Sequence, residues 1–197
     1  KNKLNNKKFW CALSTHPGEE VFCLKTHLKI KEIYKDIITI IIPRHINRAK
    51  NIETICKKYN LNSQILSKGE LIKSGKEIII INSYGVIPDY IKFCKSVFIG
   101  KSKIKKLKNV GGQNPIEAAK FGCKIYHGPY IYNFKEIYEL LNKYKIAKKI
   151  KNENDLYKKI IFDLKNKGNI GNKKIIDINK LGKKILYKTN NEIKKYL

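Results

Sequence analysis

The chain has 197 residues and a formal net charge of +27 at pH 7, from 43 basic and 16 acidic side chains. Its length allows a substantial buried core and suggests one domain, or one domain and a tail. The longest apolar runs have the length of strands, and no stretch resembles a signal peptide or a membrane span. We therefore expect this part of the protein to be soluble.

Two explanations of the charge are open. A net charge of this size is typical of proteins that bind nucleic acid or an anionic membrane. However, 41 of the 43 basic residues are lysine, and isoleucine, asparagine and tyrosine are also abundant. These residues share codons rich in adenine and thymine, so genomic base composition explains the charge equally well. No recognisable nucleic-acid-binding motif accompanies the lysines.

The sequence contains no methionine and opens on Lys1, from which we expect a fragment of a longer protein. Five widely spaced cysteines form no C-x-x-C pair, which argues against a zinc site or a disulfide framework and favours small core residues in a reducing cytoplasm. No histidine, cysteine and carboxylate cluster has metal-ligand spacing, and no serine–histidine–acid arrangement is present. The sequence thus indicates no metal, no cofactor and no catalytic residue.

Short β-rich runs alternate with amphipathic helical stretches, which predicts an α/β fold with a Rossmann-like parallel sheet and helices on both faces. We expect strands near 9–13, 37–42, 63–66, 77–81, 96–99 and 124–126. We expect helices at 19–34, 46–59, 87–94, 115–121 and 134–144. Lysine-rich stretches at 153–167 and 172–196 predict a helical C-terminal tail. The predicted organisation is a nucleotide-binding domain over 1–145 and a tail over 146–197, packed on this domain or toward a missing N-terminal domain.

Polar residues follow the first predicted strand, in the order Ser14-Thr15-His16-Pro17-Gly18-Glu19-Glu20. Ser14 or Thr15 is suited to cap the following helix, and Gly18 allows a close backbone approach. His16 is a candidate for binding a phosphate or a carboxylate, although a single loop histidine also fits a structural role.

Both arginines of the chain lie in Pro43-Arg44-His45-Ile46-Asn47-Arg48, directly after the second predicted strand. A guanidinium holds phosphate or carboxylate through two directed hydrogen bonds, which an ammonium cannot imitate. Arg44 follows the strand at once, where open α/β sheets bind ligands. Arg48 falls in the next predicted helix, where we expect a surface charge.

A glycine-rich loop precedes the predicted helix at 115–121, in the order Gly111-Gly112-Gln113-Asn114-Pro115-Ile116-Glu117. The glycines permit close approach of a ligand, Asn114 is a good helix cap, and Pro115 suits the first helical position. A helix start of this kind attracts a phosphate, and Glu117 can accept hydrogen bonds from a sugar hydroxyl. A nucleotide or nucleotide-sugar ligand and an ordinary capped helix are both consistent with this loop.

Taken in order, three motifs resemble those of 3-deoxy-D-manno-octulosonic acid (Kdo) transferases. They are the run from Ser14 to Glu20, Pro43-Arg44-His45, and the stretch from Gly111 to Gly122 that continues to Gly128-Pro129 and Asn133-Phe134. Together they cover roughly residues 10–134. The resemblance implies the C-terminal, donor-binding half of a GT-B glycosyltransferase that moves Kdo from CMP-Kdo to the lipid A precursor in lipopolysaccharide biosynthesis.

By this resemblance, the CMP-binding residues would be Pro43, Arg44, Tyr84, Gly85, Val86, Asn114, Pro115, Ile116 and Glu117. A second group, Ser14, Thr15, His16, Gly18, Gly112 and Gln113, would also line the donor site. The general base and the acceptor site would belong to a missing N-terminal domain, so this fragment alone is expected to be inactive. The family implies work at the cytoplasmic face of the inner membrane, with CMP-Kdo, the lipid A precursor and the membrane surface as partners and no nucleic acid.

The sequence departs from the family pattern at three positions. Val86 stands where a glutamate is expected, Gln113 where histidine is usual and Lys101 where a second glycine is common. Two alternatives therefore stay open: a GT-B enzyme for another nucleotide-sugar, and a basic nucleic-acid-binding module.

Overall fold

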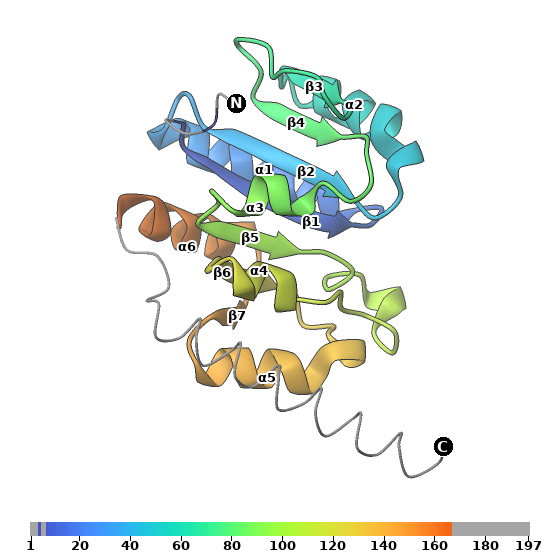
Figure 1. Cartoon of the computed structure of the whole chain (residues 1–197), viewed down its shortest axis with the longest axis vertical. Helices are drawn as coiled ribbons and strands as arrows, with labels where there is room; N and C mark the ends of the chain where they lie inside the picture. The colour runs from blue at the N-terminus through green and yellow to red at the C-terminus, as the bar shows by residue number, and fades with distance from the viewer. Residues whose placement is uncertain (1–3, 5–6, 167–197) are drawn as a thin grey trace.

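Seven parallel strands form one sheet at the centre of the molecule (Figure 1). The structure is a computed structural model that describes residue 4 and residues 7–166. The strands lie in the order β3-β4-β2-β1-β5-β6-β7, and every neighbouring pair is parallel. Their bounds are β1 Phe9–Thr15, β2 Ile38–Pro43, β3 Ser63–Leu66, β4 Ile78–Ile81, β5 Ser96–Ile99, β6 Lys124–His127 and β7 Ala147–Lys149.

Helices cover both faces of this sheet, which confirms the predicted fold class. One face carries α1 (Glu19–Ile33), α2 (Ala49–Lys58) and α6 (Glu153–Lys165). The other carries α3 (Ile87–Ile91), α4 (Ile116–Lys120) and α5 (Lys135–Lys143), and Figure 1 shows α3 and α4 in front of the strands with α1 behind them. Short 3-10 turns lie at η1 (Ile46–Arg48), η2 (Lys105–Leu107) and η3 (Tyr132–Phe134). None of the helices in the described part of the chain has the length and apolar character needed to cross a membrane.

The core consists of two apolar layers, one on each side of the sheet. Along β1, Cys11 and Leu13 pack in one layer, while Trp10 and Ala12 pack in the other. Since helices cover both faces, both sets of alternating side chains are buried, and the strands read as continuous apolar runs. All five cysteines are buried and unpaired, which confirms them as small core residues.

The polypeptide beyond Lys145 contributes to the same layered unit. Strand β7 was not predicted, because the sequence of Ala147–Lys149 has one apolar residue and two exposed lysines; its backbone nevertheless pairs with β6. Helix α6 confirms the first predicted tail helix and buries Asp163, which accepts hydrogen bonds from Ser96 Oγ (2.7 Å) and Tyr126 Oη (2.5 Å). The helix predicted at 172–196 lies outside the described residues. The division of the chain at residue 145 stays a prediction.

Candidate functional site

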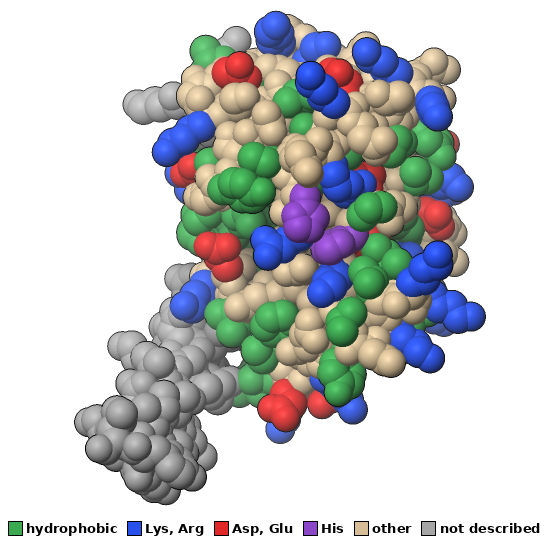
Figure 2. Space-filling model, turned by 90° about the vertical axis from the view of Figure 1, so that its right-hand side faces the viewer, with side chains coloured by type: hydrophobic (Ala, Val, Ile, Leu, Met, Phe, Trp, Pro, Cys, Tyr) green, Lys and Arg blue, Asp and Glu red, His purple; other side chains and the backbone are tan. Residues whose placement is uncertain are grey.

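The predicted site residues gather at one edge of the sheet. All strands are parallel, so the loops that leave β1, β2, β4, β5 and β6 lie at their shared carboxyl edge. The chain builds the sheet outward in both directions from β1, which has β2 on one side and β5 on the other. Ligands of open α/β sheets bind at such a point, where the strand order reverses. Figure 2 looks onto this edge and shows histidine side chains near its middle, with lysine and arginine side chains beside them.

The loop after β1 begins with a bulge. The strand register shifts between Leu13 and Thr15, and Ser14 between them has a φ of 52°, in the left-handed region. The expected cap by Ser14 or Thr15 is wrong: Gly18, with a φ of 95°, occupies the cap position of α1, and no side chain caps it. Ser14 and Thr15 lie three or four residues before this cap position, and the Thr15 hydroxyl is buried without a hydrogen-bond partner among the described residues.

His16 lies half-buried in this loop, with its ring edge-on to that of His45 at 6.0 Å between centroids. Its Nε2 atom has no partner within the described part of the chain. Burial, together with the neighbouring charges of Lys101 and Arg48, lowers the pKa of His16. The ring is therefore neutral at pH 7 and offers a ligand hydrogen bonding rather than charge.

The two arginines behave differently. Arg44 is exposed at the carboxyl edge, and its guanidinium has no partner in the described residues, whereas its amide donates to Thr15 O at 3.0 Å. Arg48 was predicted to face solvent, and this is wrong. Its side chain is only 16% exposed and makes a two-pronged ion pair with the fully buried carboxylate of Glu20, at 2.6 and 3.0 Å. Arg48, the last residue of η1, is thus occupied by Glu20, and of the two arginines only Arg44 is free for a ligand.

Glu19, beside Glu20, is a buried acceptor that the sequence did not reveal. Its carboxylate accepts four backbone N–H groups: Oε2 from His16 (3.0 Å) and Lys101 (2.7 Å), and Oε1 from Ser102 (2.9 Å) and Lys103 (3.0 Å). Burial raises the pKa of Glu19, and the four N–H donors act against that rise. A polar residue in the first turn of a helix is usually solvated, so no local signal separated Glu19 from an ordinary surface charge.

The glycine-rich loop is fixed from both sides. Gly112, at a φ of 90°, donates to Lys101 O at 2.6 Å, and Gly111 O accepts from the amide of Asn133 at 3.0 Å. Tyr138 donates its hydroxyl to Gln113 O at 2.9 Å. The backbone of this loop therefore has a defined position between the β5 and β6 ends.

Helix α4 is shorter than predicted and starts later. Pro115 lies at the cap position rather than the first helical one, and α4 has only five residues. Asn114 therefore lies one residue before the cap position predicted for it, but its Oδ1 accepts the amide of Ile116 at 2.9 Å, and this bond removes that amide from a ligand. Helix polarity is therefore a weaker source of anion affinity than expected. Glu117 is exposed, and its carboxylate has no partner within the described residues.

The loop after β4 presents an aromatic ring to solvent. Tyr84 is 66% exposed, and Gly85 follows it with a φ of 73°. Val86, at 7% exposed, packs into the core, and its carbonyl accepts the amide of Asp89 at 3.1 Å. Of the three predicted contacts here, Tyr84 and Gly85 are open to a ligand, whereas the Val86 side chain is committed to the core.

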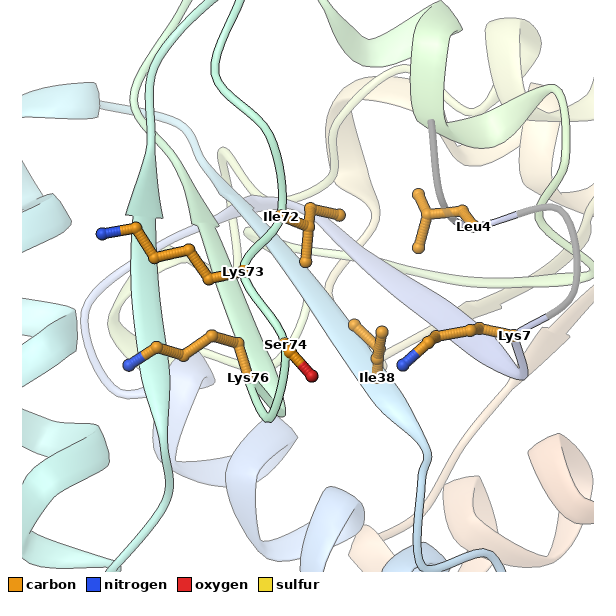
Figure 3. A pocket seen from close by; sticks show the side chains of 7 residues that line it. All are labelled: Leu4, Lys7, Ile38, Ile72, Lys73, Ser74 and Lys76. Atoms are coloured by element: carbon orange, nitrogen blue, oxygen red, sulfur yellow. The ribbon is translucent and has the colours of Figure 1, made fainter. Parts of the chain in front are cut away.

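This edge holds no group of side chains arranged for a metal ion within the described residues, and the pocket shown in Figure 3 lies elsewhere. No group of three or more His, Cys, Asp or Glu side chains within the described residues is arranged to hold a metal ion. A pocket of about 180 Å³ lies near the start of β2 and before β4, at the opposite edge of the sheet (Figure 3). It is lined by Leu4, Lys7, Ile38, Ile72, Lys73, Ser74 and Lys76.

Comparisons with known proteins agree with the motifs. No protein-family model matches the sequence. The chain is 32% identical to the 3-deoxy-D-manno-octulosonic acid transferase of Rickettsia conorii over 82% of its own length and 34% of that protein. It is 27% identical to the transferase of the same name from Aquifex aeolicus, over 78% of its own length and 41% of that protein. The chain therefore spans about a third to two-fifths of these relatives.

A solved structure supports the same assignment of fold. The C-terminal CMP-Kdo binding domain of WaaA from Acinetobacter baumannii matches with a TM-score of 0.74 and 21% identity, over 82% of each chain. At this identity the match concerns the fold alone. The resemblance that the three motifs indicated is confirmed: the chain is a relative of the 3-deoxy-D-manno-octulosonic acid transferases, and it has the fold of the C-terminal domain of WaaA.

Proposed function

We propose that this chain is the donor-binding half of a glycosyltransferase that transfers Kdo from CMP-Kdo to the lipid A precursor in lipopolysaccharide biosynthesis. The observation that carries the proposal is the set of unpartnered polar groups at the carboxyl edge. The Arg44 guanidinium and the His16 Nε2 atom lie on loops of that edge, the Glu117 carboxylate lies in the first turn of α4, and none of the three has a partner within the described residues.

Three features of this edge suit different parts of a cytidine monophosphate sugar. Arg44 matches a phosphate or a sugar carboxylate through two directed hydrogen bonds. Glu117 matches the ribose hydroxyls, which donate to a carboxylate. The exposed Tyr84 ring and the backbone of Gly85 match a pyrimidine base, since an aromatic face stacks on a planar ring. Ser14, Gly18 and Gln113 would shape the remaining wall, and the buried residues Thr15 and Gly112 would support it from behind.

The proposal assigns no catalytic base to this chain. Glu19 and Glu20 are buried and fully engaged, so neither can take a proton from an acceptor hydroxyl. The base and the acceptor site would come from an N-terminal domain, at the cytoplasmic face of the inner membrane. We expect residues 1–197 alone to bind CMP and to transfer no Kdo.

A thermal-shift and calorimetric comparison of CMP, UMP and a short DNA duplex tests this function. CMP should stabilise and bind the protein, while UMP should bind more weakly and DNA should have no effect that survives moderate salt. Preference for UMP would indicate another nucleotide-sugar, and salt-sensitive DNA binding without CMP binding would indicate a nucleic-acid-binding module. Transfer of Kdo to a lipid A precursor by residues 1–197 alone would contradict the division of labour between domains.

A further inference from the structure

The buried pair Glu19 and Glu20 stands at the reversal point of the sheet and takes no part in the function proposed above. Both side chains are 1% exposed or less, although ionised carboxylates are almost never buried without several partners. Their partners lie on opposite sides of the start of α1. Glu19 bonds the segment after β5, and Glu20 bonds the segment after β2.

The Glu19 side leads to the glycine-rich loop. The amides of Lys101, Ser102 and Lys103 donate to Glu19. The carbonyl of Lys101 accepts Gly112 N at 2.6 Å, and this amide belongs to the loop that ends at α4 and Glu117.

The same segment also reaches the loop after β6. The carbonyl of Ser102 accepts Tyr130 N at 2.9 Å, and its hydroxyl accepts Gly128 N at 2.8 Å. Glu19 thereby fixes a segment on which two further loops of the site are built.

The Glu20 side leads to Arg44. Glu20 holds the Arg48 guanidinium, which also donates to Thr15 O at 3.4 Å. The same carbonyl accepts the amide of Arg44 at 3.0 Å. The turn that carries Arg44 is therefore fastened at two points to the end of β1, and one of these points depends on Glu20.

The packing beside Glu19 is also tight. A Cβ atom on Gly100, the residue after β5, would lie 2.7 Å from Thr15 Cα and 2.8 Å from Glu19 Oε2. The residue after β5 therefore packs directly against the Glu19 carboxylate, so a shift of this carboxylate displaces the segment that follows β5.

We propose that Glu19 and Glu20 are positioning residues for the donor site, each serving a different part of the ligand. Glu19 fixes the position of the glycine-rich loop and of Glu117, and Glu20 fixes the position of Arg44. This inference rests on the proposed function. It predicts that the two carboxylates act on nucleotide affinity through separate routes.

Double-mutant cycles on CMP binding in the natural full-length protein test the proposal, with affinity measured by calorimetry. Glu19→Gln places an amide NH₂ against backbone N–H donors, and it should weaken CMP about tenfold in the wild-type background but less than about threefold when Glu117→Ala is already present. Glu20→Gln should show the same dependence on Arg44→Ala. The crossed pairs, Glu19 with Arg44 and Glu20 with Glu117, should have independent effects on affinity.

The matched control is Asp163→Asn. Asp163 is also a buried carboxylate with two side-chain donors, but it joins α6 to the sheet away from the site. Asp163→Asn should lower the melting temperature and leave CMP affinity unchanged. Loss of a buried carboxylate's hydrogen bonds would then not by itself weaken CMP binding, and the loss of affinity in Glu19→Gln would need the positioning role. If either glutamine variant fails to fold, Glu19→Asp or Glu20→Asp, which keeps the charge and shortens the side chain, replaces it in the same cycle.

The outcomes separate the two claims. Coupling within each pair and independence of the crossed pairs would support the positioning role. If the wild-type protein binds CMP but the substitutions have independent effects on CMP affinity in all four double mutants, the positioning role is overturned and the proposed function stands. The same holds if the glutamine variants lower stability alone. Absence of CMP binding by the wild-type protein would overturn the proposed function and this inference with it.

Discussion

Replacing each arginine by lysine should separate ligand binding from stability, because the two guanidinium groups have different surroundings. Arg44→Lys keeps the charge but loses one of two directed bonds to an anion, so CMP affinity should fall by about 1–2 kcal/mol, or roughly 5- to 30-fold. Since Arg44 is exposed and has no side-chain partner in the described residues, its replacement should change the free energy of unfolding by less than about 0.5 kcal/mol.

Arg48→Lys should show the reverse pattern. A lysine cannot reproduce both hydrogen bonds to the buried carboxylate of Glu20, so we expect a loss of about 1.5–3 kcal/mol in the free energy of unfolding. CMP affinity should change only about two- to threefold, through the turn that carries Arg44. Urea unfolding and calorimetric titration of both variants measure the two quantities. Equal losses of affinity, or a stability loss at Arg44 that matches the one at Arg48, would refute the assignment of roles.

Three further predictions concern the ribose contact, acid stability and the membrane. Glu117→Ala should weaken CMP by about 1.5–3 kcal/mol without lowering the melting temperature, and unchanged affinity in a calorimetric titration would reduce Glu117 to a surface charge. Burial lowers the pKa of His27 and of His127 to about 4 in the folded protein, against an unfolded value of about 6.5. The unfolded state therefore binds more protons, and stability should fall as pH drops from about 6.5 to 4, by about 3 kcal/mol per histidine. His27→Gln should remove about half of this pH dependence of urea unfolding, and an unchanged pH dependence would contradict the assignment to this histidine. Anionic vesicles should bind the protein more strongly than neutral ones, with loss of binding in salt, and indifference to both variables in a sedimentation assay would leave base composition as the explanation of the charge.

The central strands and the loops that follow them could be predicted from the sequence, because their signals are local. Unbroken apolar runs such as Ile78–Ile81 mark strands buried on both faces, and a parallel sheet brings their carboxyl ends to one edge. Strand β7 gave no such signal. It is held by backbone hydrogen bonds to β6, and two of its three side chains are exposed lysines.

The roles of Glu19, Glu20 and Arg48 could not be predicted, because their partners are remote in sequence. Glu19 bonds amides more than 80 positions away, and the two members of the Glu20–Arg48 pair are 28 positions apart. Two glutamates at a helix start fit a favourable helix dipole just as well, and an arginine one residue into a helix fits a surface charge. Only the packing of the loops around the end of β1 distinguishes these interpretations.

The departures from the family pattern have different structural consequences. Val86 packs into the apolar core, so the glutamate expected there is replaced by a residue that serves stability. Gln113 is held by its carbonyl, which accepts the Tyr138 hydroxyl, and that bond is indifferent to the side chain at this position. Lys101 has a φ of 55°, where a glycine costs less strain, yet its amide and its carbonyl both bond within the site. At Gln113 and Lys101 the hydrogen bonds that hold the segment are made by backbone groups, not by the side chains. Under the proposed function, these two segments would offer the donor their backbone groups, and Arg44, Glu117, Tyr84 and His16 would supply the side chains that select it.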